Sequence, residues 1–103
     1  MYCSAIVAAT SIPANNAFAI SADDVSNKMS KDERFGYVTG MLDMLTYQAS
    51  IGGNKPKADC IVEAYYGDGK DAAWEKLLAA FEALPEKYPA SIVTVLVNKA
   101  CGE

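Results

Sequence analysis

The chain has no histidine, only three cysteines, and only nine lysines and arginines against thirteen acidic residues. Without histidine, Ser-His and Cys-His catalytic pairs and all histidine-containing metal sites are excluded. The net charge of −4 argues against sequence-independent binding of nucleic acid, because phosphate contacts depend on clustered Lys and Arg. These absences indicate a non-enzymatic protein without a cofactor, a metal site or a nucleic-acid partner.

Long apolar runs are missing as well. The N-terminal apolar stretch is interrupted by Thr10, Ser11 and Pro13, and it is too short to span a bilayer. Apolar residues nevertheless make up 51% of the 103 residues, which is not the composition of a disordered chain. A chain of this length supports one domain. We therefore expect one small folded domain with no membrane span.

The N-terminus has the composition of a secretory leader. The first 22 residues carry no charge, and Ala17-Phe18-Ala19 matches the A-x-A pattern that signal peptidase cleaves. Residues 1–19 would then be a signal peptide and residues 20–103 the mature domain in the periplasm. A basic residue ahead of the apolar stretch is missing, which an upstream start or a trimmed leader would explain. The alternative is an uncharged disordered arm.

The cysteine count agrees with export. Cys3 would leave with the leader, and Cys60 and Cys101 would remain as an even pair, which predicts a disulfide in an oxidising compartment. Closing a loop of roughly 42 residues stabilises a chain by about 4 kcal/mol in the chain-entropy model. The alternative is a pair of reduced, buried thiols in a cytosolic protein. A redox site is disfavoured because no C-x-x-C spacing occurs.

Residues that begin and end helices, together with the spacing of apolar residues, predict four helices. Ser30 and Glu33 form a capping box ahead of apolar residues that recur every three or four positions. The predicted helices, each bounded by Pro, Gly or Asp signals, cover Lys31–Ile51 and residues 57–66, 72–84 and 91–100. The last segment is rich in β-branched residues, but a lone strand would have no partner in a helical chain.

The predicted fold is therefore an all-α, four-helix bundle with one disulfide, and one further helical turn at residues 21–28 would make a fifth helix. Asp71 is the expected N-cap of the third helix, and Trp74 is the expected centre of the core. Inward positions follow from the spacing of apolar residues: Phe35, Val38, Leu42, Leu45 and Ala49, joined by Tyr37, Met41 and Met44; Cys60, Ile61, Ala64 and Tyr65; and Leu77, Leu78, Phe81 and Leu84.

Two glycines inside the first predicted helix need an explanation, because each costs about 1 kcal/mol relative to Ala. Gly36, Gly40, Asp43 and Tyr47 fall on one narrow helix face. We expect the glycines to allow close approach of a neighbouring helix, with Asp43 hydrogen-bonded nearby. The other interpretation is a ligand-binding carboxylate in a glycine-lined groove.

A second candidate contact lies at the end of the next helix. Tyr65 and Tyr66 precede the Gly67-Asp68-Gly69 turn, and tyrosine is common at protein interfaces. We expect one of the two tyrosines in the core, and the pair with Asp68 forms a candidate protein contact. The acidic residues around Gly69 lack the Glu of a calcium loop, which indicates a solvated turn.

The segment from Phe35 to Asp43, FGYVTGMLD, resembles the G-Y-V-x-G-x-x-D signature of the Rap/Tai family, with Gly36, Tyr37, Gly40 and Asp43 in the matching positions. Members of this family are periplasmic immunity proteins against type VI secretion amidase effectors. The order of features from Met29 to Gly102, including Cys60 and Cys101, is similar as well. The resemblance implies a small HdeA-like helical bundle and a secreted peptidoglycan amidase as partner, and it implies a homodimer.

Two function classes remain open from the sequence. One is a dedicated protein-binding module of the immunity type. The other is an HdeA-type acid-stress chaperone, because protonation of the thirteen carboxyl groups would change the net charge from −4 to about +9. Any acidic protein shows such a change, so the signature favours the first class.

Overall fold

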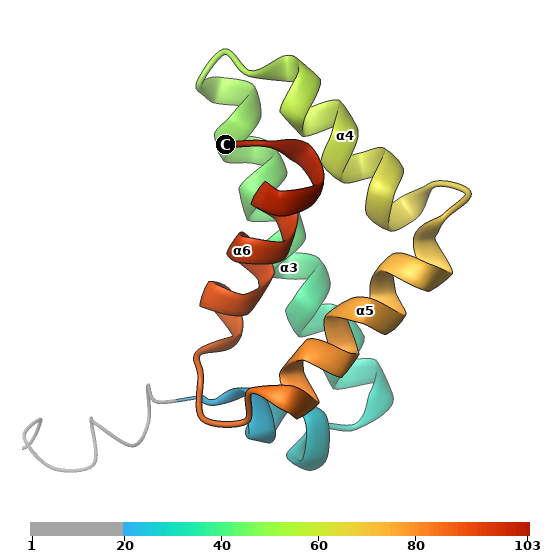
Figure 1. Ribbon diagram of the computed structural model, residues 1–103, viewed down its shortest axis with the longest axis vertical. Helices are drawn as coiled ribbons and strands as arrows, with labels where there is room; N and C mark the ends of the chain where they lie inside the picture. The colour runs from blue at the N-terminus through green and yellow to red at the C-terminus, as the bar shows by residue number, and fades with distance from the viewer. Residues whose placement is uncertain (1–19) are drawn as a thin grey trace, which may run out of the picture.

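The computed structural model describes residues 20–103, and these residues form a small all-α bundle with no strand (Figure 1). Its elements are a short π-helical turn and four α-helices: η1 (Asp24–Lys28), α3 (Lys31–Ile51), α4 (Lys55–Tyr66), α5 (Lys70–Ala83) and α6 (Pro89–Cys101). The predicted fold class is therefore confirmed. The proposed signal peptide, its Ala17-Phe18-Ala19 site and Cys3 lie outside the described residues.

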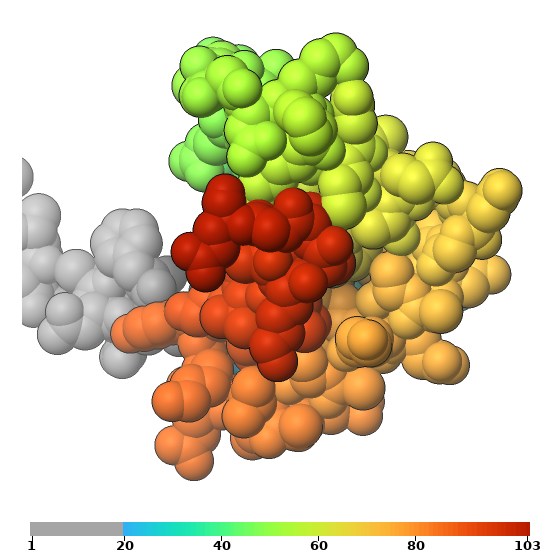
Figure 2. Space-filling model, turned by 45° about the horizontal axis from the view of Figure 1, so that its top comes forward, coloured from blue at the N-terminus to red at the C-terminus, as the bar shows by residue number. Residues whose placement is uncertain are grey.

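The four helices pack around one another without forming layers. The chain turns back after α3, so that α4 lies beside it, and α6 contacts α3, α4 and α5. Figure 2 shows the C-terminal end of α6 in the middle of one face, between α4 on one side and α5 on the other. In this arrangement one side of the long helix α3 faces the core, and its other side faces solvent.

The ends of α3 follow from local chemistry. The Glu33 amide donates to the Ser30 hydroxyl at 3.1 Å, and the Glu33 carboxylate accepts from the Ser30 amide at 2.8 Å, which completes the predicted capping box. After Ile51 the chain turns through Gly53, whose φ of 81° favours glycine. Both ends of α3 agree with the prediction.

Helix α4 begins two residues earlier than predicted. The Asn54 side chain accepts a hydrogen bond from the Lys57 amide at 3.1 Å and so caps the helix ahead of Pro56. The helix ends at Gly67, where a side chain would collide with Glu63. Proline near the start and glycine just past the end therefore bracket α4, as the sequence indicated.

The other two helices also differ slightly from the prediction. Helix α5 starts at Lys70 with Gly69 as its N-cap, so Asp71 lies inside the first turn and the expected Asp71 cap is wrong. Helix α6 begins at Pro89, and its β-branched residues are helical. Their side chains find packing partners on three neighbouring helices, which outweighs their modest preference for strands.

The described N-terminal segment is attached to the bundle at both ends. The Ala22 amide donates to the Lys87 carbonyl at 2.8 Å, in the loop between α5 and α6. The Arg34 side chain donates from Nε to the Val25 carbonyl at 3.0 Å and from Nη2 to the Ser26 carbonyl at 3.1 Å. These bonds satisfy carbonyl groups of η1 that the short turn leaves without partners.

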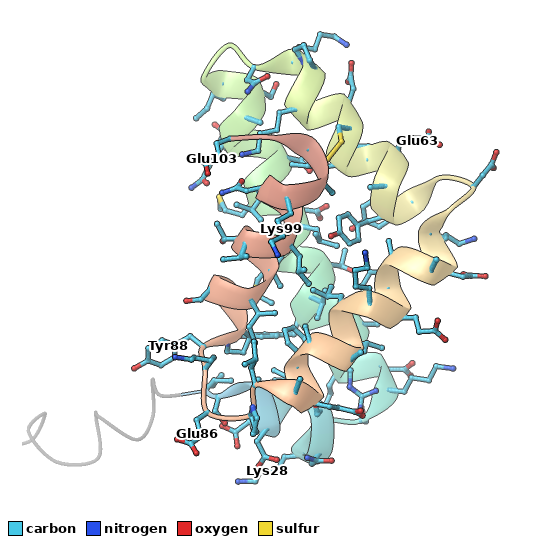
Figure 3. The ribbon with its side chains drawn as sticks, in the orientation of Figure 1. Lys28, Glu63, Glu86, Tyr88, Lys99 and Glu103 are labelled. Carbon is cyan, nitrogen blue, oxygen red and sulfur yellow. A yellow bond between two sulfur atoms is a disulfide. The ribbon has the colours of Figure 1, made fainter. Side chains whose placement is uncertain are left out.

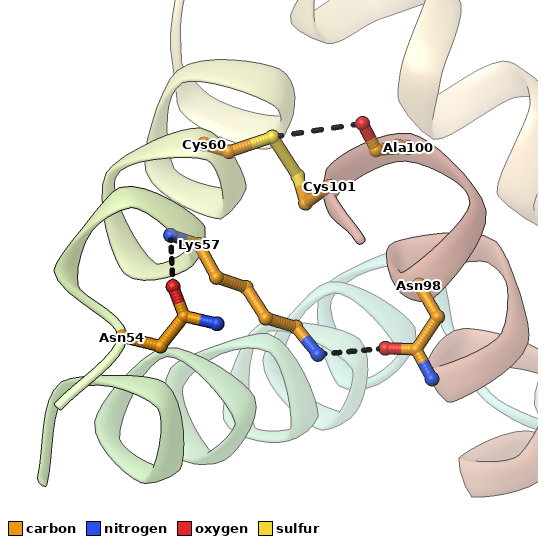
Figure 4. The surroundings of a disulfide bond; sticks show 6 residues. All are labelled: Asn54, Lys57, Cys60, Asn98, Ala100 and Cys101. Carbon is orange, nitrogen blue, oxygen red and sulfur yellow. Dashed lines mark hydrogen bonds between the residues drawn. A yellow bond between two sulfur atoms is a disulfide. The ribbon is translucent and has the colours of Figure 1, made fainter. Parts of the chain in front are cut away.

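A disulfide joins Cys60 on α4 to Cys101 at the end of α6, with Cα atoms 5.7 Å apart (Figure 4). Beside it the Lys57 ammonium donates to the Asn98 side-chain oxygen at 2.8 Å. Two links of different chemistry therefore hold α6 against α4. The predicted pairing is confirmed.

The core contains no buried polar or charged residue among residues 20–103. Its largest fully buried side chains are Phe81, Leu42, Ile61 and Leu77, which come from three helices. Three inward expectations are wrong. Phe35, Met44 and Leu84 are exposed because each lies on the outer side of its helix or beyond the packed turns. Trp74 is only partly buried and lies at the edge of the core.

Candidate functional site

The glycine face of α3 points into solvent. Gly36 and Gly40 are exposed, and a Cβ atom placed on either of them would have no heavy atom of another part of the chain within 4 Å. The same face continues through Asp43 to Tyr47, whose side chain is 59% exposed. The expectation that a neighbouring helix packs against the glycines is therefore wrong. The reason is that Val38, on the opposite side of the helix, faces the core instead.

Helix α3 carries large apolar residues on its outer side as well as on its inner side. Val38 and Leu42 are fully buried, whereas Met44, Tyr47 and Ile51 are exposed on the outer side. An amphipathic surface helix has polar residues on its outer side, and a helix that is apolar all round is normally buried. Within residues 20–103, nothing covers the outer side of α3. The exposed apolar residues and the two exposed glycines therefore make this side of α3 the candidate site.

Helix α4 extends this face. Tyr66 is 39% exposed, and Val62 lies one turn before it on the same side of α4 and is exposed as well. The preceding Tyr65 is buried, with 4% of its surface exposed. One tyrosine of the pair is thus in the core, as expected, and Tyr65 is not available as a contact. We refer to Gly36, Gly40, Asp43, Tyr47, Val62 and Tyr66 as the α3–α4 face.

The polar groups of the α3–α4 face meet at Tyr66. Burial raises the pKa of the Tyr66 phenol above its ordinary value of 10; the nearby Thr39 hydroxyl lowers the pKa, and the Asp43 carboxylate raises it. The Thr39 Oγ1 atom is buried and has no hydrogen-bond partner of ordinary geometry among the described residues. A hydroxyl group, a phenol and a carboxylate therefore lie together beside the glycines.

Asp43 is the only charged residue on α3 between Arg34 and the end of the helix at Ile51. In the part of the chain that the structure describes, its carboxylate makes no ion pair and no hydrogen bond. Glu63, which Figure 3 labels on α4, is exposed and also has no ion pair there. Asp43 therefore leaves uncompensated negative charge on the face, and Glu63 adds a second unpaired carboxylate on α4.

The remaining predicted residues lie away from this face. Tyr37 is partly buried and packs against the core, so it supports α3 from the inner side. Asp68 is exposed in the turn between α4 and α5. Cys60 and Cys101 are joined, and they hold the middle of α4 against the end of α6. Of the predicted residues, the structure brings together Gly36, Gly40, Asp43 and Tyr66.

Two contacts beside this face were missed from the sequence. Phe35 stacks on Trp74, with ring centroids 5.4 Å apart, and the Trp74 indole donates to the Tyr65 carbonyl at 2.9 Å. This stack ties α3, α4 and α5 together at the edge of the exposed surface. Periodicity placed both rings in the core, and no signal in the sequence indicated this stack at its edge.

Residues 20–103 contain no cluster of three or more Cys, Asp or Glu residues placed to hold a metal ion. None of the described helices is both long enough and apolar enough to cross a bilayer.

Comparisons with family models, with curated proteins and with solved structures give no match to the chain. The function must therefore be inferred from the chain's own surface and chemistry.

Proposed function

We propose that this chain is a non-enzymatic, periplasmic module that binds another protein through the α3–α4 face. The observation that carries the proposal is the exposed side of α3, where two glycines alternate with Asp43 and large apolar side chains. Glycines without neighbours in their own chain allow the backbone of a second protein to come close to the helix. The two glycines destabilise α3 in the free protein, and contacts with the partner would offset that loss in the complex.

The composition of the face favours a protein over a small molecule. Tyr47 and Tyr66 are the residue type that most often anchors protein interfaces, and Val62 continues the apolar surface between the helices. Small-molecule sites are concave pockets, whereas this surface runs along the outside of two helices. The free Asp43 carboxylate calls for Lys or Arg on the partner.

The resemblance to the Rap/Tai family suggests which class of protein binds this face. The matching residues of its signature divide between the two sides of α3: Gly36, Gly40 and Asp43 are exposed, whereas Tyr37 packs against the core. The exposed half of the signature coincides with the face for which the binding role is proposed. We infer that the partner is a secreted peptidoglycan amidase effector, and that binding neutralises it.

Calorimetric titration of the purified protein with type VI amidase effectors tests this role, together with amidase activity in the same mixtures. The proposal expects saturable binding at neutral pH and loss of amidase activity at one equivalent. Suppression of aggregation of unrelated proteins only at acid pH would instead assign the HdeA-type chaperone role. Light scattering of the protein alone identifies a homodimer, and a dimer that masks the α3–α4 face would contradict the proposal.

A further inference from the structure

A second apolar surface lies on the opposite pair of helices. Helices α5 and α6 form a half-open groove with a volume of about 330 Å³. Its lining comes from α5, from the following loop and from α6: Ala80, Leu84, Lys87, Ser91, Ile92, Val95, Leu96 and Lys99. The Leu84 side chain is 44% exposed and that of Val95 is 53% exposed, so two large apolar residues remain in solvent.

The charge of this groove differs from the charge of the whole chain. The protein carries a net charge of −4, but the lining of the groove contains two lysines and no carboxylate. Neither Lys87 nor Lys99 forms an ion pair within residues 20–103. Lys99, labelled in Figure 3, lies near the C-terminal end of α6, and Lys87 lies just before its N-terminal end. The groove therefore has apolar residues in its middle and an unpaired lysine at each end. A ligand that matches it is apolar and carries two negative charges that lie far apart.

We propose that the α5–α6 groove binds an acidic amphipathic helix of a partner protein. Twelve positions separate Lys87 from Lys99, and most of them lie in helix α6. At a rise of 1.5 Å per residue, the backbones of the two lysines are about 15–18 Å apart. On a partner helix, acidic residues at positions i and i+11 lie on one side and about 16 Å apart. Apolar residues at i+4 and i+7 lie on the same side and reach the floor between Leu84 and Val95.

Other occupants fit the groove less well. A single fatty-acid headgroup would use one lysine and leave the other unpaired, and a half-open groove would leave much of the chain in water. A second copy docked groove to groove would bring Lys87 and Lys99 of the two copies together, which like-charge repulsion opposes. A helix with paired acidic residues matches both the open shape and the two charges. This site does not depend on the role of the α3–α4 face.

The test uses a fluorescein-labelled synthetic peptide of roughly 16 residues, Ala-rich, with Glu at i and i+11 and Leu at i+4 and i+7. A control peptide of identical composition has its Glu residues on the opposite side of the helix. Anisotropy with the full-length protein should give saturable binding of the first peptide, weakened by salt, and at least tenfold weaker binding of the control. Equal binding of the two peptides, or no saturable binding, would overturn the proposal.

Three variants locate the site. Val95→Glu, at an exposed position, should weaken binding about tenfold or more, and Lys99→Glu should weaken it about threefold to fivefold. Lys31→Glu makes the same charge change on another exposed part of the molecule and should leave binding unchanged. Circular dichroism confirms that each variant is folded, and Leu84→Ser takes the place of Val95→Glu if that variant does not fold. Full binding by Val95→Glu would overturn the proposal, and so would displacement of the peptide by palmitate or by phosphatidylglycerol vesicles at lower concentrations than an unlabelled copy of the peptide.

Discussion

Replacing both exposed glycines of α3 by alanine should stabilise the fold. At Gly36 and Gly40 the backbone is helical and an added Cβ meets no heavy atom within 4 Å. Alanine at an exposed helix position is worth about 0.5–1 kcal/mol over glycine, so the double variant should gain about 1–2 kcal/mol. For a domain of this size, that gain raises the melting temperature by roughly 4–16 °C.

Gly53→Ala is the matched control, because it makes the same chemical change where the sign should reverse. Gly53 has a φ of 81°, a conformation that disfavours a side chain, so alanine there should lower the melting temperature. Thermal unfolding followed by circular dichroism measures both changes. If Gly36→Ala and Gly40→Ala lower the melting temperature as Gly53→Ala does, the glycines are packed against something and the exposed face does not exist.

Three further predictions concern stability. Replacing Cys60 and Cys101 by Ser should lower the free energy of unfolding by about 4 kcal/mol in urea titrations, and a chain that unfolds equally with and without reductant would contradict the disulfide. Ser30→Ala should cost about 1 kcal/mol by removing the capping box, measured in the same way, and no loss would mean that the cap is not formed. The Ser21 amide and then Lys28 lower the pKa of Asp24, so this carboxylate stabilises the fold above its unfolded pKa of 3.8 and the contribution is lost as the pH falls through the folded value. Asp24→Asn should therefore reduce the loss of stability between neutral and acid pH, and an unchanged pH profile would refute the assignment.

Local signals predicted most of the fold. The capping box at Ser30, the Pro and Gly brackets around α4 and the even cysteine pair each depend on a few neighbouring residues, so they can be recognised from sequence. The helical state of the β-branched α6 also followed from a simple argument about missing strand partners. Contacts over long distances could not be predicted. The bonds from Arg34 to η1 and from Lys57 to Asn98 depend on how the helices cross.

The candidate site was only half predictable. Spacing placed Gly36, Gly40, Asp43 and Tyr47 on one side of α3, and this grouping follows from helical geometry alone. Spacing also placed Val38 and Leu42 on the side that faces the core, and both are fully buried. The cost of two glycines inside a helix favoured packing of a neighbouring helix over a ligand-binding groove, and that expectation was wrong because the partner helices lie on the opposite side of α3.

Titration of an amidase effector into the parent protein and into Gly40→Leu tests the central claim most directly. Leucine at position 40 has open space in the free protein, so the variant should melt at or above the parent temperature, but its side chain should block the partner and weaken binding tenfold or more. Gln48→Leu adds the same side chain elsewhere on the exposed surface of α3 and should bind like the parent. If Gly40→Leu is folded and binds the effector as tightly as the parent, the α3–α4 face is not the binding site.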